Sequence, residues 1–285
     1  MSAEPATRDG RCILCGAEPA PESYWTREIV RCACGLVYTD QRRAKPPDEL
    51  YGKSFFEGQD AYHDYQAERA VLQRNFKNHL DVLARYQPSG TLLEIGCAFG
   101  FCLELAQARW QASGIDISAH AVEQARARGV QAVAGSYLEH TLPADSLDVI
   151  CMWDTLEHLD RPDLFLRKAA RELKPGGVLA LTTGDIGSLN ARLRGRKWRL
   201  VHPTHFFYFS RATMTRLLAA AGLRPVHYTT TVHWRSVKNI ANQIGANAGS
   251  GLPQKALFAL RDSPLGRLHV PMNLHDIMFV VARKA

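Results

Sequence analysis

The chain has 285 residues, of which 46% are hydrophobic and 22% charged. This composition is that of an ordinary globular protein, long enough for one catalytic domain and a small appendage. The start, MSAEPATRDG, lacks the basic-then-apolar pattern of a secretion signal, and no apolar run approaches the roughly 18 residues that a membrane span needs. We therefore expect a soluble, cytoplasmic protein without a transmembrane segment.

The net charge of +7 is unevenly distributed. Residues 186–285 hold 15 Lys and Arg against two Asp, a balance of +13, whereas residues 1–185 hold 20 basic against 26 acidic side chains, a balance of −6. Such asymmetry indicates that the C-terminal part faces something anionic: a phosphate, a carboxylate, nucleic acid or a lipid headgroup. A basic, solvated surface is the alternative.

Four of the seven cysteines lie near the N-terminus, as Cys12, Cys15, Cys32 and Cys34. They form a C-x2-C pair and a C-x-C pair, each followed by glycine, which is typical of turns around a thiolate-bound zinc. Four thiolates leave no open position, so this zinc would be structural. Disulfide bonds are the rival explanation, which the missing secretion signal disfavours. The remaining three, Cys97, Cys102 and Cys151, are expected to be small buried hydrophobes.

The cysteines divide the chain into a zinc ribbon with its linker (1–47) and a larger domain (48–285). QRRAKPP (41–47) has the composition of a linker. An aromatic-rich stretch follows, which we expect to pack either across the mouth of a ligand site or under a loop; its rings are Tyr51, Phe55, Phe56, Tyr62 and Tyr65. A helix is predicted from about 66 to 85, with leucines at helical spacing.

Strands and helices then alternate, which predicts an α/β, Rossmann-like doubly wound sheet of seven strands with the last antiparallel. The predicted strands are TLLEI (91–95), SGIDI (113–117), VQAVAG (130–135), LDVICMW (147–153), GVLALTT (177–183), LRPVHYTTT (223–231) and DIMFVVAR (276–283). Ser118 and Ser210 are predicted helix N-caps. The basic region 186–274 includes an insertion, 232–274, far longer than a usual connection, which we expect to help define the substrate.

The stretch TLLEIGCAFG (91–100) predicts a site for an adenosine-bearing cofactor. A buried strand breaks at Gly96 into a turn of small residues, and Gly100 opens a helix predicted over FCLELAQARW (101–110). Asp116 ends the next strand 22 positions after Glu94. An acid at about this distance can accept hydrogen bonds from both ribose hydroxyls. The turn is not the G-x-G-x-x-G that cradles a pyrophosphate, which disfavours a nicotinamide cofactor.

At these residues the chain resembles the class I S-adenosylmethionine-dependent methyltransferases, whose first motif is an acid, any residue, then G-x-G-x-G. Ala98 departs from that pattern by one methyl group. ADSLDVICMWDTLEHLDRP (144–162) and LKPGGVLALTT (173–183) extend the resemblance, which covers roughly residues 70–285. It implies cofactor contacts from Glu94, Gly96, Cys97, Ala98, Gly100, Asp116, Ile117, Ser136, Tyr137 and Trp153.

After the fourth strand, Asp154, Glu157 and His158 have the spacing of neighbours on one helix surface. They are similar to the E-x-x-E-H of the ubiquinone-biosynthesis O-methyltransferases, which implies a divalent metal such as magnesium. D-x-x-E before a helix is also a capping box, and we prefer that interpretation. His158 is then a candidate general base that titrates near neutral pH.

The second candidate region, RLRGRKWRLVHPTHFFYF (192–209), begins just beyond the carboxyl end of the fifth strand, where open α/β sheets bind ligands. Its five cations are Arg192, Arg194, Arg196, Lys197 and Arg199. It resembles the W…H…F-S stretch of small-molecule methyltransferases, which implies that His205 lies near the acceptor. For His202 a structural role is expected.

Taken together, these patterns predict a methyltransferase that moves a methyl group from S-adenosylmethionine to an oxygen, or less readily a nitrogen or carbon, of a small or lipid- or carrier-linked anionic acceptor. Asp154, Glu157, His158 and His205 are the candidate catalytic residues. RNA methylation is one alternative, although the N-terminal region is not basic and no N-P-P-Y-like tetrad follows the fourth strand. A non-catalytic cofactor- or partner-binding protein is another. The sequence does not indicate the oligomeric state.

Overall fold

The computed structural model describes residues 11–18, 24–26, 28–40, 65–247 and 251–285. The expected linker at 41–47 and the aromatic residues Tyr51, Phe55, Phe56 and Tyr62 lie outside the described residues.

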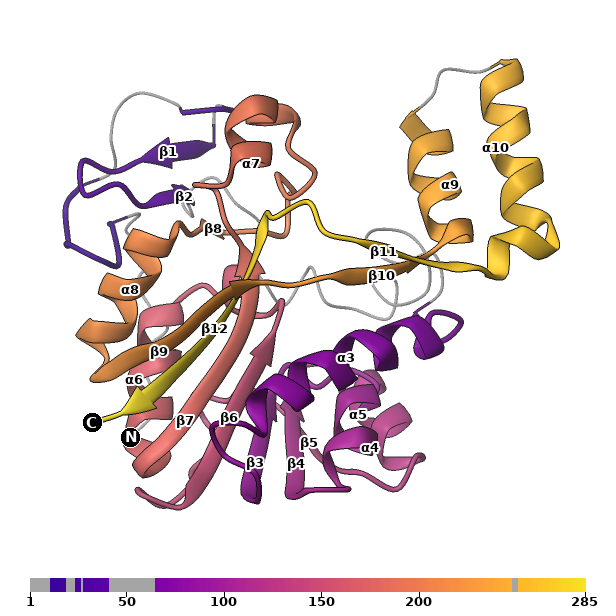
Figure 1. Ribbon diagram of the computed structural model, residues 1–285. Helices are drawn as coiled ribbons and strands as arrows, with labels where there is room; N and C mark the ends of the chain where they lie inside the picture. Colours follow the sequence, from indigo (N-terminus) through magenta and orange to yellow (C-terminus); the bar gives the residue numbers. More distant parts are fainter. Residues whose placement is uncertain (1–10, 19–23, 27, 41–64, 248–250) are drawn as a thin grey trace.

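A seven-stranded sheet forms the centre of the molecule (Figure 1). Its strands, in spatial order, are β5 (Gln131–Ala134), β4 (Trp110–Asp116), β3 (Gly90–Ile95), β6 (Leu147–Trp153), β7 (Leu173–Gly184), β12 (Ile277–Lys284) and β9 (Leu223–Thr230). β12 runs antiparallel to both of its neighbours, and the ladders from β5 to β7 are parallel. The predicted seven strands with an antiparallel last strand are therefore confirmed.

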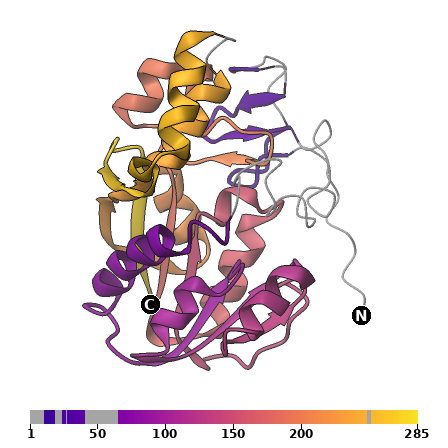
Figure 2. The same ribbon diagram turned by 90° about the vertical axis from the view of Figure 1, so that its right-hand side faces the viewer.

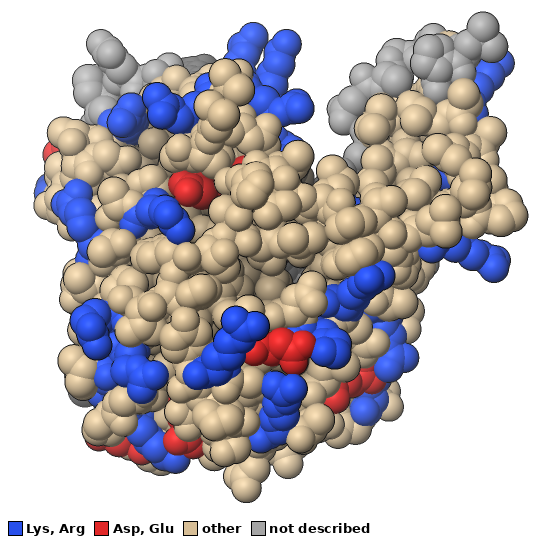
Figure 3. Space-filling model, in the orientation of Figure 1, with Lys and Arg blue, Asp and Glu red and all other residues tan. Residues whose placement is uncertain are grey.

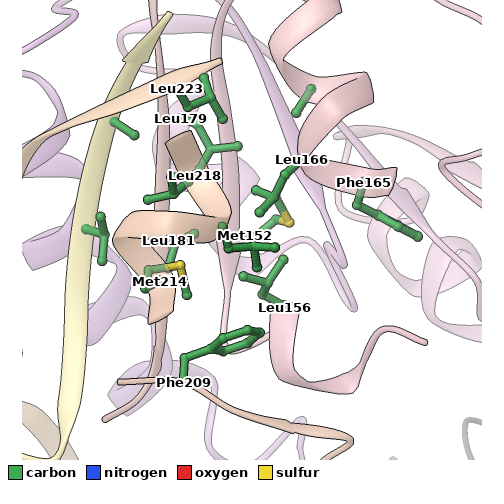
Figure 4. Packing of buried hydrophobic residues seen from close by; sticks show 14 of the residues in the cluster. Met152, Leu156, Phe165, Leu166, Leu179, Leu181, Phe209, Met214, Leu218 and Leu223 are labelled. Atoms are coloured by element: carbon green, nitrogen blue, oxygen red, sulfur yellow. The ribbon is translucent and has the colours of Figure 1, made fainter. Parts of the chain in front are cut away.

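Helices cover both faces of this sheet. One face packs against α3 (Arg69–Leu83), α4 (Phe101–Ala106) and α5 (Ala119–Arg126), and the other against α6 (Pro162–Glu172) and α8 (Arg211–Ala220). Figure 4 shows the second layer, where Met152 and Leu181 of the sheet meet Leu166, Met214 and Leu218 of the helices. The predicted caps are confirmed, because the hydroxyls of Ser118 and Ser210 accept backbone N–H groups of their helices.

The helix after the glycine turn is shorter than predicted. α4 ends at Ala106, and β4 already begins at Trp110. Trp110 is buried, and its indole N–H donates to the carbonyl of Gln87 at 3.2 Å. Burial of this large ring at the start of β4 therefore overrides the helical pattern of residues 101–110.

The N-terminal ribbon shares a sheet with the larger domain. Its strands β1 (Ile29–Arg31) and β2 (Val37–Thr39) pair antiparallel, and β2 also pairs with β8 (Phe207–Tyr208). Because β8 belongs to the segment that carries His205, the ribbon and the predicted acceptor segment form one structural unit.

The insertion forms a two-stranded stem and a helical arm that projects from the body (Figures 1 and 2). The stem is β10 (His233–Ser236) paired with β11 (His269–Met272). The arm consists of α9 (Val237–Asn247), α10 (Leu252–Asp262) and the 3-10 turn η3 (Pro264–Arg267). Among the described residues, no helix combines the length and apolar character that crossing a bilayer requires.

Candidate functional site

The turn after β3 has an unusual backbone. The φ angles of Gly96, Ala98 and Gly100 are +79°, +45° and +75°, in the left-handed region that glycine adopts freely and alanine at a cost of about 1 kcal/mol. A Cβ at Gly96 would lie 2.7 Å from the side chain of Thr155. The turn thus needs glycine at its first position and tolerates a strained Ala98 at its centre.

Asp116 at the end of β4 fixes this turn through both carboxylate oxygens. The N–H of Ala98 donates to Oδ2 at 2.8 Å, and the N–H of Ser118 donates to Oδ1 at 2.9 Å. Burial raises the pKa of Asp116, and the two N–H groups oppose that rise. Each oxygen keeps a second lone pair, so the carboxylate can accept two further hydrogen bonds, as a ribose diol would supply.

Glu94 lies beneath the turn and is 2% exposed. Its Oε2 has no hydrogen-bond partner among the described residues. Burial, and secondly the negative charge of Asp116, raise the pKa of Glu94 well above its ordinary value. A buried, incompletely partnered acid beside a second acid is suited to a cationic ligand, and S-adenosylmethionine carries an ammonium and a sulfonium. The residues present fit that cofactor.

The other predicted cofactor residues differ in what they offer. Ile117 is 52% exposed and leaves a free apolar surface beside Asp116. Tyr137 is buried, and its hydroxyl donates to Glu172 at 2.6 Å, so it is not available to an adenine. Cys97 is buried, with its side chain against Gly114. Trp153 is also buried, donates to Cys102 Sγ and stacks on Phe279, behind the turn rather than on it.

Asp154 does not start a helix, so the capping-box interpretation is wrong. Its φ is +48°, and its carboxylate accepts a hydrogen bond from the hydroxyl of Thr182 at 2.8 Å instead of from first-turn amides. The only helical turn here is the 3-10 turn η1 (Leu156–His158), which has no side-chain cap, and α6 begins at Pro162. The i, i+3, i+4 geometry assumed for this segment therefore does not exist.

The structure instead brings His158 beside His205. The N–H of Phe206 donates to the carbonyl of Glu157 at 2.8 Å, and Nδ1 of His158 lies 2.9 Å from the carbonyl oxygen of Thr204. Because a carbonyl only accepts, the neutral ring of His158 carries its proton on Nδ1 and its lone pair on Nε2. The two imidazole centroids are 4.6 Å apart, with the rings perpendicular.

Both histidines are neutral at physiological pH. Burial lowers the pKa of His158 to about 4. It also lowers the pKa of His205 well below its ordinary value, with the neighbouring His158 and His202 adding to the effect. The expectation that His158 titrates near neutral pH is corrected by this burial. In the opposite sense, burial and the charge of Asp154 raise the pKa of Glu157 to about 8.

Glu157, His158 and His205 are also positioned as potential metal ligands. Each offers one ligand atom, and these atoms lie within 4.8 Å of one another. Asp154, for which the family resemblance implied this role, is absent from the group, and His205 takes its place. One carboxylate with two imidazoles suits a transition metal better than magnesium, which prefers oxygen ligands.

The five cations of residues 192–199 do not act as one cluster. Arg199, although itself partly exposed, pairs with the buried Asp276 (1% exposed) at a nitrogen–oxygen distance of 2.9 Å. Burial opposes ionisation of Asp276, but Arg199 and the indole N–H of Trp198 hold its pKa below the ordinary value. The other four cations are exposed. His202 bonds to the hydroxyl of Thr204 at 2.8 Å, in keeping with a structural role.

A cavity of about 140 Å³ opens between the stem, α9 and the edge of the sheet. Its lining residues are Arg199, Thr231, His233, Arg235, Ile240, Ile244, Met272, Leu274, Asp276 and Ile277. Nε2 of His233 is buried without a hydrogen-bond partner among the described residues, and so is Nδ1 of His79, whose Nε2 lies 3.0 Å from the Thr231 hydroxyl. Sequence reasoning missed both histidines, because only the folded chain brings residues 79 and 233 together.

The four N-terminal cysteines converge as the sequence predicts. The Sγ atoms of Cys12 and Cys34 are 3.6 Å apart and those of Cys15 and Cys32 3.4 Å apart, and all four lie within 4.8 Å of one another. A disulfide requires about 2.05 Å, whereas tetrahedral coordination with Zn–S bonds of about 2.3 Å separates sulfurs by roughly 3.8 Å. This geometry is compatible with a zinc ribbon.

Comparison with known proteins agrees with the cofactor turn. A methyltransferase-domain family model matches residues 65–228. The chain is 28% identical over 176 residues to a probable S-adenosylmethionine-dependent methyltransferase of Mycolicibacterium smegmatis, which covers 61% of this chain and 66% of that protein. It is 30% identical over 213 residues to the malonyl-[acyl-carrier protein] O-methyltransferase of Dechloromonas aromatica, covering 68% of this chain and 79% of that protein.

A shorter match, 31% identical over 116 residues, is to the ubiquinone biosynthesis O-methyltransferase of Idiomarina loihiensis, covering 38% of this chain and 46% of that protein. Among solved structures, an S-adenosylmethionine-dependent methyltransferase from Archaeoglobus fulgidus superimposes with a TM-score of 0.54 at 17% identity, covering 81% of this chain and 97% of that one. The chain belongs to the methyltransferase-domain family, whose model matches residues 65–228, and is an S-adenosylmethionine-dependent methyltransferase.

Proposed function

We propose that this methyltransferase methylates a hydroxyl oxygen of a small or carrier-linked anionic acceptor in a biosynthetic pathway, with His158 receiving the hydroxyl proton and His205 assisting beside it. The supporting observation is the contact between these two neutral imidazoles, whose centroids are 4.6 Å apart. His158 lies in the 3-10 turn η1, and Thr155 at the start of η1 lies close to Gly96 of the cofactor turn. The O-methyltransferases among the relatives agree with an oxygen acceptor.

The cofactor, when bound, supplies an electrophilic methyl group on a sulfonium. Methyl transfer then needs an aligned nucleophile and a place for its proton. In such a transfer, Nε2 of His158 would accept the proton that the acceptor hydroxyl loses. Glu94 and Asp116 would hold the ammonium and the ribose. The carbonyl of Thr204 keeps the ring proton of His158 on Nδ1, which makes Nε2 the basic nitrogen.

The cavity beside the stem supports an acceptor with an apolar part. Apolar side chains from α9 and β11 form much of its wall, and Arg199, Arg235 and His233 give it polar groups. A volume of about 140 Å³ is close to that of a dry cavity that holds one benzene ring. We therefore propose that the insertion 232–274 binds a ring-sized apolar portion of the acceptor.

We also propose that Cys12, Cys15, Cys32 and Cys34 bind a structural zinc. The division into a ribbon with linker (1–47) and a methyltransferase domain (48–285) is part of this proposal. Cysteines that bind zinc rather than forming disulfides are typical of a reducing compartment, which supports a cytoplasmic location. Pairing of β2 with β8 supports a role for the ribbon in holding the acceptor segment.

Transfer of a radiolabelled methyl group to a panel of phenols, hydroxy acids and carrier-linked hydroxy acids tests the proposal. His158→Ala and His205→Ala should each lower kcat by roughly 10²–10⁴-fold, the usual effect of losing a general base, with unchanged cofactor affinity. His140→Ala, a histidine outside the site, is the matched control. Transfer to amines only, with hydroxyl acceptors inert, would overturn the assignment of an oxygen acceptor.

A metal-assisted reaction is the second candidate function. It is favoured by the ligand atoms of Glu157, His158 and His205, which lie within 4.8 Å of one another. A bound cation lowers the pKa of a coordinated hydroxyl directly. We expect turnover to survive chelator treatment that leaves the ribbon intact. Loss of turnover in chelator and its rescue by an added divalent metal, but not in Glu157→Gln, would establish the metal-assisted reaction instead.

A further inference from the structure

The short helix α7 (Leu189–Arg194) presents two leucines to solvent. Leu189 is 71% exposed and Leu193 78% exposed, the highest values among the large hydrophobic side chains of the described residues. They are four positions apart and so lie on one side of the helix. A single exposed leucine is ordinary, but an adjacent pair on a protruding element marks a surface for an apolar partner.

The fold holds these leucines outward. The hydroxyl of Ser188 caps the helix by accepting the N–H of Ala191 at 3.1 Å. Ala191 is fully buried and packs with Trp198 and Ile29 in a small core shared with the ribbon. Because the opposite side of α7 is anchored in that core, Leu189 and Leu193 have no route to burial within the body.

Exposed cations surround the leucine pair. Arg192, Arg194, Arg196 and Lys197 are all exposed, and residues 186–201 contain no acidic side chain. Figure 3 shows Lys and Arg side chains gathered at the top of the body, over α7. The surface formed by residues 189–197 therefore combines apolar tips with a ring of positive charge.

We propose that the 189–197 surface docks on an anionic lipid bilayer. The leucines would enter the boundary between headgroups and acyl chains, and the four cations would contact the anionic headgroups. Nucleic acid is a poorer match, because single-stranded binding surfaces stack bases on exposed rings. Residues 189–197 contain no aromatic side chain, and Trp198, which follows them, is 2% exposed.

The position of α7 would bring a docked bilayer close to the candidate site. β7 ends at Gly184, and α7 follows at the carboxyl edge of the sheet, the edge at which His158 and His205 lie. A bilayer held there would face the site and deliver an acceptor that partitions into lipid. This last step rests on the proposed function, whereas the docking itself does not.

Sedimentation of the full chain with phosphatidylcholine vesicles, with and without about one third phosphatidylglycerol, tests the proposal. We expect binding to the anionic vesicles only, weakened by added salt. Leu189→Ser/Leu193→Ser should lower the partition coefficient at least about tenfold, since burial of even one leucine is worth that factor. Charge reversal of Arg192 and Arg194 should lower it by about fivefold per residue or more.

Val133→Ser, which changes a 41% exposed side chain on the outer strand β5, is the matched control and should bind as the wild type does. Melting temperature and cofactor affinity should be unchanged in the leucine variant, which separates loss of docking from loss of the cofactor site. Absence of vesicle binding, equal binding by the leucine variant, or a preference for an RNA oligonucleotide over anionic vesicles would each overturn the proposal. Vesicle binding by a chain that fails to bind S-adenosylmethionine would leave this inference standing and remove the cofactor-site assignment.

Discussion

At the residue level, Asp116 has an observed role in holding the turn and a predicted role in binding the cofactor. Its carboxylate holds the N–H groups of Ala98 and Ser118 at 2.8 and 2.9 Å and keeps lone pairs for a ribose. Asp116→Ala should weaken binding of S-adenosylmethionine and of its demethylated product by roughly 1.5–3 kcal/mol, the value of charge-assisted hydrogen bonds. Titration calorimetry with both ligands measures this.

Asp116→Asn is the matched control for that substitution, because it keeps an acceptor for one of the two N–H groups and a similar shape. We expect it to bind more tightly than the alanine variant and less tightly than the wild type. If the alanine variant binds both ligands with wild-type affinity, the cofactor does not lie at Asp116.

The sequence predicts which residues lie together where they follow neighbouring strands. The glycine turn and Asp116 are fixed by two adjacent strands in parallel register, so spacing along the chain translates directly into position. For Asp154, spacing along the chain does not predict the contacts. Its hydrogen-bond partner, Thr182, lies on the next strand of the sheet. The neighbour of His158 is His205, which is 47 positions further along the chain. Neither contact has a signature within the D-x-x-E-H stretch itself.

At the level of elements, the ribbon touches the predicted acceptor segment through Thr39. Its hydroxyl donates to the carbonyl of His205 at 3.0 Å, and its N–H donates to the carbonyl of Phe206 at 2.7 Å. Thr39→Val should therefore lower kcat by about fivefold, the effect of losing one hydrogen bond of about 1 kcal/mol, with little change in cofactor affinity. Steady-state kinetics and calorimetry together separate these effects.

Loss of the predicted zinc should disturb the contact between the ribbon and the acceptor segment more strongly than Thr39→Val does. Cys12→Ser/Cys15→Ser should lose one zinc per chain by metal analysis and lower kcat further than Thr39→Val. Thr215→Val, which removes a hydroxyl on α8 that lies 3.0 Å from Tyr228, is the matched control. Full activity in a zinc-free variant would show that the ribbon does not position His205.

Elements are predictable from the sequence when their packing repeats a simple pattern. The buried strands, such as LDVICMW at 147–153, are continuous apolar runs flanked by turns. In the structure this strand, β6, begins and ends at the predicted residues. β8 is only two residues long and exists because β2 pairs with it. The arm likewise depends on contacts with its stem. Short or partner-dependent elements carry too little local signal to be predicted.

For the whole molecule, the charge asymmetry of the sequence separates into distinct roles. Arg199 neutralises the buried Asp276, 77 positions away, whereas the exposed cations of residues 192–197 form a surface. The sum of +13 over residues 186–285 could not distinguish these cases, because an ion pair across the fold and a solvated arginine contribute equally to a count. The two cases differ in the structure because Arg199 pairs with a buried carboxylate.

Burial of His79 gives the molecule an acid-sensitive core. His79 is 3% exposed, its ring centroid lies 4.9 Å from that of Trp153, and burial, followed by the proximity of His233, lowers its pKa to about 3. In the unfolded chain the pKa of histidine is about 6.5. Between these values the unfolded state binds the proton and the native state does not, so the free energy of unfolding must fall as the pH falls from about 6.5 toward 3.

The contribution of His79 is therefore complete above about pH 6.5 and decreases below it by up to about 1.4 kcal/mol per pH unit. His79→Gln removes the titrating ring and some packing on Trp153. We expect this variant to be less stable than the wild type at pH 7, with a difference that shrinks at pH 6 and again at pH 5. Urea unfolding at the three pH values measures this, with His140→Gln, outside the core, as the matched control. A difference between wild type and variant that stays constant across the series would mean that His79 takes up its proton in the native state, and that its burial does not account for acid sensitivity.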